Sequence, residues 1–262
     1  MELTFGELTF RLEYGKRAVL VLGDSESPVA ECALAGQDKL SRDGKHVPTA
    51  EGSLLRFCDY ELSDDTLTIV QLSGRLRSET VFRRYTDCNT VRVFQRIVNV
   101  SQETLCVSQV SALVLYGICK DSLHTLKNTY LYRFFNSWHC ECQPRRTNLF
   151  EAGLYSTGHA SFRRVYGSNK GGWSTKEELP QGIVRSGDRY MMFAIESPND
   201  WYWEFGECEQ GIYLYLGGAD AYEHEWELRL AAGEAYETPA VAVCHGSSVS
   251  DTVAQMTRYR RH

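Results

Sequence analysis

Hydrophobic and polar residues alternate along most of the chain. In the first such run Leu8, Phe10 and Leu12 alternate with charged or hydroxyl-bearing residues, which is the period of a half-buried β-strand. The same pattern recurs at residues 18–22, 67–72, 91–100, 105–115, 190–196, 212–216 and 224–230. Turn-forming clusters separate the runs, and no long helical pattern lies between them. The chain is therefore predicted to be all-β, a large sandwich of two antiparallel sheets that spans residues 1–246 as one domain.

Two strongly aromatic strands lie in the second half of the chain. Residues 201–206 read Trp-Tyr-Trp-Glu-Phe-Gly, and residues 213–218 read Tyr-Leu-Tyr-Leu-Gly-Gly. The period of two places Trp201, Trp203 and Phe205 on one face of the first strand, with Tyr202 and Glu204 on the other. Indoles beside tyrosine and carboxylate groups are typical of sugar-binding surfaces. They are also typical of a sandwich core, and the exposure of the indoles distinguishes the two interpretations.

Only the carboxyl end has a helical pattern. Ser248 and Asp251 provide capping groups after Gly246. The apolar residues at helical spacing are Val249, Val253, Met256 and Tyr259. We predict a helix over residues 247–262. Since the sequence shows no partner for its apolar stripe, we expect this helix to lead to another domain.

Composition and charge exclude several classes of partner. The formal net charge of -6 gives no electrostatic basis for binding nucleic acid or an anionic membrane. No apolar run reaches the roughly 18 residues of a membrane-spanning helix. The nine cysteines are irregularly spaced, and no signal segment is visible at the amino terminus. These features predict a cytoplasmic protein with free thiols.

The segment His139-Cys140-Glu141-Cys142 contains side chains that zinc binds readily. A structural zinc site requires a second pair of ligands, and the other cysteines are isolated, so we expect no metal. Alternation instead places Trp138, Cys140 and Cys142 on one face of a strand, with both cysteines in the core.

Motifs of several enzyme classes are missing from the sequence. No Gly-x-Ser-x-Gly elbow or phosphate-binding glycine loop occurs, which argues against α/β-hydrolases and nucleotide-dependent enzymes. Glu204, Glu207 and Glu209 follow one another along one segment, and this does not place two carboxyls across a cleft as glycoside hydrolysis requires. A sugar epimerase would need a histidine and a carboxylate that face one groove. The histidines considered for this role are His139, His159, His224 and His245.

Five motifs occur in an order and spacing that resemble one enzyme family. They are residues 138–143 (Trp-His-Cys-Glu-Cys-Gln), 169–174 (Asn-Lys-Gly-Gly-Trp-Ser), 201–206, 213–218 and 233–239 (Gly-Glu-Ala-Tyr-Glu-Thr-Pro). Together they resemble the amino-terminal domain of bacterial α-galactosidases (melibiases) of glycoside hydrolase family 36. The resemblance covers the chain from about Val91 to its end.

This resemblance implies a galactose mutarotase-like β-supersandwich whose terminal helix leads to a (β/α)8 catalytic barrel. In the family, retaining hydrolysis of terminal α-galactosides uses two barrel aspartates, one of them in a Lys-Trp-Asp motif. That motif does not occur in this chain, and a barrel would need roughly 250 further residues. We therefore expect residues 1–262 alone to hold no catalytic residues, to need no cofactor and to hydrolyse nothing.

The resemblance implies a structural role, in packing on the barrel and in homo-oligomer assembly. In tetrameric members an arginine after a glycine turn contacts the sugar in the adjacent subunit, and Arg56 in the segment 52–56 corresponds to it. Leucines replace the residues that usually precede this arginine, and the simpler interpretation is an exposed arginine at a strand edge.

The other role is that of a carbohydrate-binding module. The candidates for sugar contact are Trp173, Trp201, Tyr202, Trp203 and Glu204.

Overall fold

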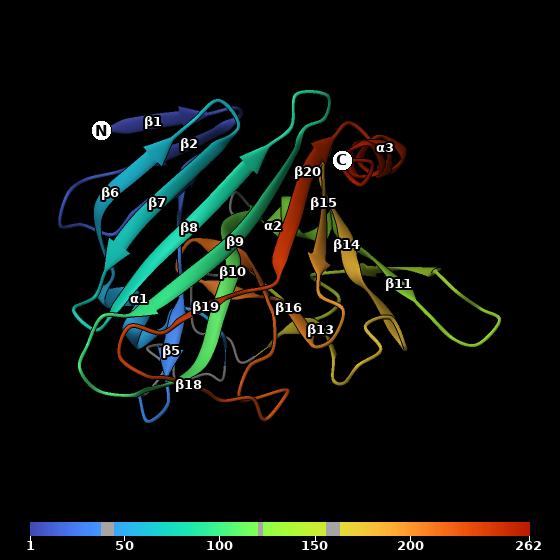
Figure 1. Ribbon diagram of the computed structural model, residues 1–262. Helices are drawn as coiled ribbons and strands as arrows, with labels where there is room; N and C mark the ends of the chain where they lie inside the picture. Colours follow the sequence, from blue (N-terminus) through green and yellow to red (C-terminus); the bar gives the residue numbers. More distant parts are fainter. Residues whose placement is uncertain (38–44, 120–122, 156–162) are drawn as a thin grey trace.

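The computed structural model describes residues 1–37, 45–119, 123–155 and 163–262. Most of these residues lie in antiparallel strands, which form two layers around a common core (Figure 1). The predicted all-β sandwich is confirmed. Within the described ranges, no helix has the length and apolar character to cross a membrane.

The first layer is a ten-stranded sheet with the order β12-β11-β14-β15-β20-β9-β8-β7-β6, and β19 also pairs with β9. Its strands are β6 (Arg56–Leu62), β7 (Thr66–Leu72), β8 (Leu76–Arg84), β9 (Thr90–Asn99), β11 (Thr129–Phe135), β12 (Gln143–Asn148), β14 (Glu178–Ser186), β15 (Arg189–Glu196), β19 (Ala235–Glu237) and β20 (Ala240–Gly246). On β8, buried Leu76 and Phe82 alternate with exposed Arg77 and Arg83, so the period of two places one face on the core.

The second layer contains two sheets. A six-stranded sheet has the order β13-β16-β17-β10-β18, with β5 also paired to β10, and a four-stranded sheet has the order β1-β2-β3-β4. These strands are β1 (Glu2–Phe5), β2 (Leu8–Arg11), β3 (Val19–Leu22), β4 (Ser25–Pro28), β5 (Cys32–Leu34), β10 (Leu105–Cys119), β13 (Val165–Asn169), β16 (Trp201–Cys208), β17 (Gly211–Gly217) and β18 (Leu228–Leu230). The Tyr116 amide donates to Ser27 Oγ at 2.7 Å, which joins β10 to β4.

One continuous core lies between the two layers. Phe10 from the four-stranded sheet, Phe82 and Phe193 from the ten-stranded sheet, and Trp203 and Leu214 from the six-stranded sheet all belong to it and are fully buried. Phe193 packs edge-on against Trp203, with ring centroids 5.8 Å apart. All three sheets therefore depend on one another for burial.

The described part of the chain also contains three short helices: α1 (Ala50–Leu54), α2 (Leu123–Lys127) and α3 (Val249–Tyr259). Helix α3 confirms the helix predicted at the carboxyl end, and Ser248 caps it by accepting a hydrogen bond from the Asp251 amide at 3.1 Å. Met256 and Tyr259 pack on the outer face of β14, β15 and β20, so the ten-stranded sheet supplies the apolar partner that the sequence did not show. Val253, predicted in the same stripe, is 42% exposed.

The hairpin between β11 and β12 projects from the sandwich (Figure 1). The segment 136–142 at its tip is a loop, in which Trp138 is 79% exposed and Cys140 and Cys142 are also exposed. The predicted placement of both cysteines in the core is wrong. The positive φ angles of His139 (59°) and Cys142 (53°) interrupt the alternation on which that prediction depended. All nine cysteines are free thiols.

Candidate functional site

The side chains on the two faces of the aromatic strand β16 pack in two different clusters. Trp201, Trp203 and Phe205 point into the core between the sheets, and Tyr202 belongs to a separate cluster on the outer face of the six-stranded sheet. This confirms the predicted assignment of faces. Gly167 on β13 lies against Trp203, where a Cβ atom would be 2.6 Å from the indole ring, so the site requires glycine.

Four of the residues predicted for sugar contact are fully buried. Trp201, Tyr202, Trp203 and Glu204 each have an exposed fraction of 0%. Residues 45–49 lie over Tyr202 and Glu204: Val47 packs with the outer-face tyrosines, and the His46 ring stacks on Tyr202 with centroids 4.2 Å apart. In this structure none of the four presents a surface to a ligand.

The Glu204 carboxylate is surrounded by donors. It accepts hydrogen bonds from the hydroxyls of Tyr202 (2.6 Å) and Tyr213, and from the His46 amide (3.2 Å). The His46 Nδ1 atom and the Arg164 Nη1 atom lie 3.0 and 3.1 Å from Glu204 Oε2. A carboxylate has about four lone-pair sites, so these contacts leave none free for a substrate.

The contacts continue from Glu204 through His46 to a second acid. His46 Nε2 lies 3.0 Å from Asp220 Oδ2, so the imidazole bridges two buried carboxylates. The Asp220 amide donates to His224 Nδ1 at 3.2 Å, and His224 Nε2 donates to the Asn169 carbonyl at 3.0 Å. We call this set the Glu204 network; its members are Glu204, His46, Asp220, His224, Arg164, Tyr202 and Tyr213.

The pKa values in the network follow from this pairing. Burial by itself would raise the pKa of Glu204, but the His46 charge and the hydrogen bonds from His46 and the two tyrosines lower it to about 2. Burial by itself would lower the pKa of His46, but attraction to Glu204 and the bonds to both acids raise it above its usual value. The pKa of Asp220 is lowered, since His224 and His46 outweigh its desolvation.

The low pKa of Glu204 and its full set of hydrogen-bond donors favour a structural role and argue against a role as catalytic acid or base. A carboxyl with a pKa of about 2 holds no proton to donate near neutral pH. Glu204 is a hydrogen-bonding residue of strand β16. Contacts within the network join three segments to strand β16: residues 45–46, Arg164 and the turn at 220–224.

The other two predicted contact residues are exposed. Trp173 is 64% exposed in the loop after β13. Arg56 begins the edge strand β6, and its guanidinium donates to the carbonyls of Ser53 (2.7 Å) and Leu55 (2.9 Å). The segment before it forms helix α1 instead of a glycine turn. Figure 1 shows β6 and β13 well apart, so the two residues do not share one site.

The histidines considered for an epimerase lie in separate places. His139 is at the exposed tip of the β11–β12 hairpin, His159 lies outside the described residues, and His224 belongs to the Glu204 network. His46 was missed in the sequence because its partners Glu204 and Asp220 are 158 and 174 positions away. No local pattern signals such a contact.

His245 lies at a groove between the four-stranded and ten-stranded sheets. Two cavities of about 390 and 460 Å³ adjoin there, and both are lined by Leu22, Arg189 and His245. Among the residues that the structure describes, one carboxylate lines each cavity, Glu7 in the first and Asp188 in the second.

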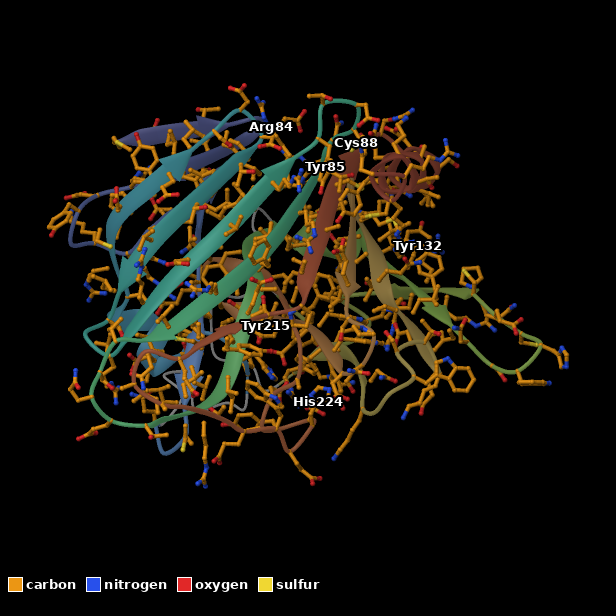
Figure 2. All side chains as sticks on the ribbon, viewed as in Figure 1. Arg84, Tyr85, Cys88, Tyr132, Tyr215 and His224 are labelled. Carbon is orange, nitrogen blue, oxygen red and sulfur yellow. The ribbon has the colours of Figure 1, made fainter. Side chains whose placement is uncertain are left out.

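Figure 2 shows Arg84, Tyr85 and Cys88, which line the first cavity, near one end of the sandwich. The same view places His224, a member of the Glu204 network, toward the opposite end. In the part of the chain that the structure describes, no group of three or more His, Cys, Asp or Glu residues is arranged to hold a metal ion.

Comparisons with solved structures identify the fold. The chain is similar to the GH36 α-galactosidase AgaA from Geobacillus stearothermophilus, with a TM-score of 0.68 and 13% identity over 95% of this chain and 40% of that one. It is similar to the α-galactosidase from Lactobacillus brevis, with a TM-score of 0.69 and 12% identity over 100% of this chain and 41% of that one. A galactose mutarotase related enzyme from Lactobacillus acidophilus gives a TM-score of 0.53 and 9% identity, over 96% and 98% of the two chains.

No protein-family model matches the sequence, and no curated protein matches it. At these identities the structural likeness shows a shared fold. The chain spans about 40% of the length of the GH36 α-galactosidases it matches.

Proposed function

We propose that this chain is the non-catalytic amino-terminal β-sandwich domain of an α-galactosidase-type glycoside hydrolase. In the complete enzyme, terminal α-galactosides would be hydrolysed by a (β/α)8 barrel that follows residue 262. One observation carries the proposal: the fold agrees over 94% of this chain or more, yet occupies only about 40% of each α-galactosidase.

The chemistry of the chain supports placing catalysis elsewhere. A retaining glycosidase needs two carboxyls about 5–5.5 Å apart, one of them protonated at working pH. Glu204 is buried, saturated with donors and ionised. Within the described ranges, each of the two cavities offers one carboxylate.

The roles that we assign to the domain are packing on the barrel and assembly of a cytoplasmic homo-oligomer. Helix α3 already lies on the outer face of the ten-stranded sheet, so a barrel that continues from it would begin beside β14, β15 and β20. The exposed guanidinium of Arg56 remains a candidate for the rim of a neighbouring active site.

Two experiments test this function. The coding sequence downstream of the codon for His262 should encode a barrel that contains Lys-Trp-Asp. Purified residues 1–262 should show no turnover of an aryl α-galactoside above the buffer blank. Turnover that co-elutes with the pure domain would contradict the proposal.

A carbohydrate-binding module is a second candidate, because Trp173 exposes 64% of its surface in a loop. If Trp173 stacks on galactose or raffinose, millimolar sugar should change the tryptophan fluorescence, and Trp173→Ala should abolish the change. Trp138→Ala is the matched control, since Trp138 is similarly exposed on a different loop. A flat response in the unmodified domain argues against this candidate.

A sugar epimerase is a third candidate, because the mutarotase related enzyme matches this chain over 98% of its own length. Polarimetry of freshly dissolved α-D-galactose separates this activity from the proposed one. We expect the domain to leave the rate of mutarotation at its buffer value. A rate that rises in proportion to protein concentration would favour the epimerase.

A further inference from the structure

The groove beside His245 reaches into the core of the sandwich. Side chains from both layers form its floor, among them Phe5, Leu20, Phe82, Leu115 and Val243. The two cavities share Leu22, Arg189 and His245 in their linings, so they adjoin, and the groove opens to solvent. Spaces of roughly 300–1,000 Å³ with apolar walls and a few polar groups are typical of small-molecule sites.

Three polar side chains at the rim are available for a ligand. Glu7, Arg189 and His245 are exposed, and none of them has a hydrogen-bond or ion-pair partner among residues 1–37, 45–119, 123–155 and 163–262. They influence one another electrostatically: desolvation in the groove lowers the pKa of His245, the Glu7 charge opposes this, and the Arg189 charge adds to it. Near neutral pH these three side chains present one anion, one cation and one uncharged imidazole, and the lining also includes one further cation, Arg84, and one further anion, Asp188, so the positive and negative charges around the groove balance.

The charges of these side chains determine which ligand head group fits beside them. A carboxylate or phosphate would be attracted by Arg189 but repelled by Glu7. An ammonium group would be attracted by Glu7 but repelled by Arg189. A neutral head with several hydroxyls satisfies both residues, because a hydroxyl donates to Glu7 and accepts from Arg189. The apolar floor requires that the rest of the molecule be hydrophobic.

We propose that the groove binds a neutral amphiphile of the alkyl or aryl glycoside class, with its hydrocarbon between the sheets and its hydroxyls on Glu7, Arg189 and His245. The site does not depend on the function proposed above. Binding there involves no bond cleavage, so hydrolysis of an aryl α-galactoside and occupancy of the groove are separate measurements.

The test is isothermal titration of the domain with hexyl β-D-galactopyranoside below its micelle concentration. Free galactose is the polar half of the probe, and hexanoate is an amphiphile of the same chain length with an anionic head. We expect the glycoside to bind at least tenfold more tightly than either of them. Glu7→Gln and Arg189→Gln should each weaken binding roughly tenfold, because each removes a hydrogen bond to a charged group. Arg229→Gln, an exposed arginine on β18, is the control and should leave binding unchanged.

Methyl NMR locates the bound probe. Shifts should be confined to groove residues such as Leu22, Leu115 and Val243, and all variants should keep the melting temperature of the parent. Three results would overturn the proposal: no binding at millimolar glycoside, binding of hexanoate as tight as that of the glycoside, or binding that neither rim variant weakens.

Discussion

The Glu204 network and the rim of the His245 groove use the same three kinds of side chain in opposite states. Each contains a glutamate, an arginine and a histidine: Glu204, Arg164 and His46 in one, and Glu7, Arg189 and His245 in the other. His46 and Arg164 both contact the Glu204 carboxylate, at 3.0 and 3.1 Å, and Glu204 and His46 are fully buried. The second three are exposed and have no hydrogen-bond or ion-pair partner within the described residues.

The difference between the two regions shows which charged side chains stabilise the fold and which are available to a ligand. A buried charge is tolerated only when it is paired, so the network must stay closed for the strand and its covering segments to remain together. Exposed charges remain solvated and cost little when unpaired, so the rim can leave its groups available to a ligand. The two histidines differ in their pairing: both are desolvated, but the two carboxylates that contact His46 raise its pKa, whereas His245 has no bonded carboxylate within the described residues and its pKa is lowered.

Removing one buried charge should have the largest effect. Glu204→Gln leaves the His46 and Arg164 charges without their shared carboxylate, and breaking a buried ion pair in this way costs about 3–5 kcal/mol. We therefore expect the free energy of unfolding, measured with urea, to fall by about that amount.

Glu7→Gln is the matched control, because the same chemical change at an exposed and unpaired position should alter stability by less than about 0.5 kcal/mol. Equal losses in the two variants would contradict the distinction between the regions.

The arginines should show a smaller contrast. Arg164 has a side chain 23% exposed, and it reaches Glu204, the Tyr202 hydroxyl and Glu223. Arg164→Gln should destabilise the domain by about 1.5–3 kcal/mol, the usual range for hydrogen bonds to charged groups. Arg189→Gln should leave the urea midpoint unchanged. If Arg189→Gln is the more destabilising of the pair, the rim is structural and the groove is closed in solution.

The sequence predicts the fold better than it predicts the sites. Alternation identifies strands such as β16 and even their faces, because the burial of Trp201 and Trp203 is a local consequence of the period of two. The contacts of His46 are not local, and only the paired sheets bring residues 46, 204 and 220 together. His245 was one of four candidates of equal standing, since nothing in the sequence shows that Glu7 and Arg189 come close to it. The exposed cysteines of the hairpin illustrate the opposite error, in which a loop imitates a strand pattern.

The histidines should give the smallest contrast, visible in the pH dependence of stability. A raised pKa in the folded state contributes stability that is present below the unfolded value, near 6.5, and is lost as the pH rises through the folded value. His46 should therefore stabilise the domain more at pH 6 than at pH 9, and His224, whose pKa is also raised, acts in the same direction. His245 has a lowered pKa, so its protonation at acid pH favours the unfolded chain.

Relative to the parent, His46→Gln should lose most stability at acid pH, whereas His245→Gln should gain slightly there. Each histidine changes the slope of the free energy of unfolding against pH by at most about 1.4 kcal/mol per pH unit. Urea unfolding between pH 5.5 and 9 measures both, and the same sign of change for the two variants would mean that the groove histidine is paired in solution.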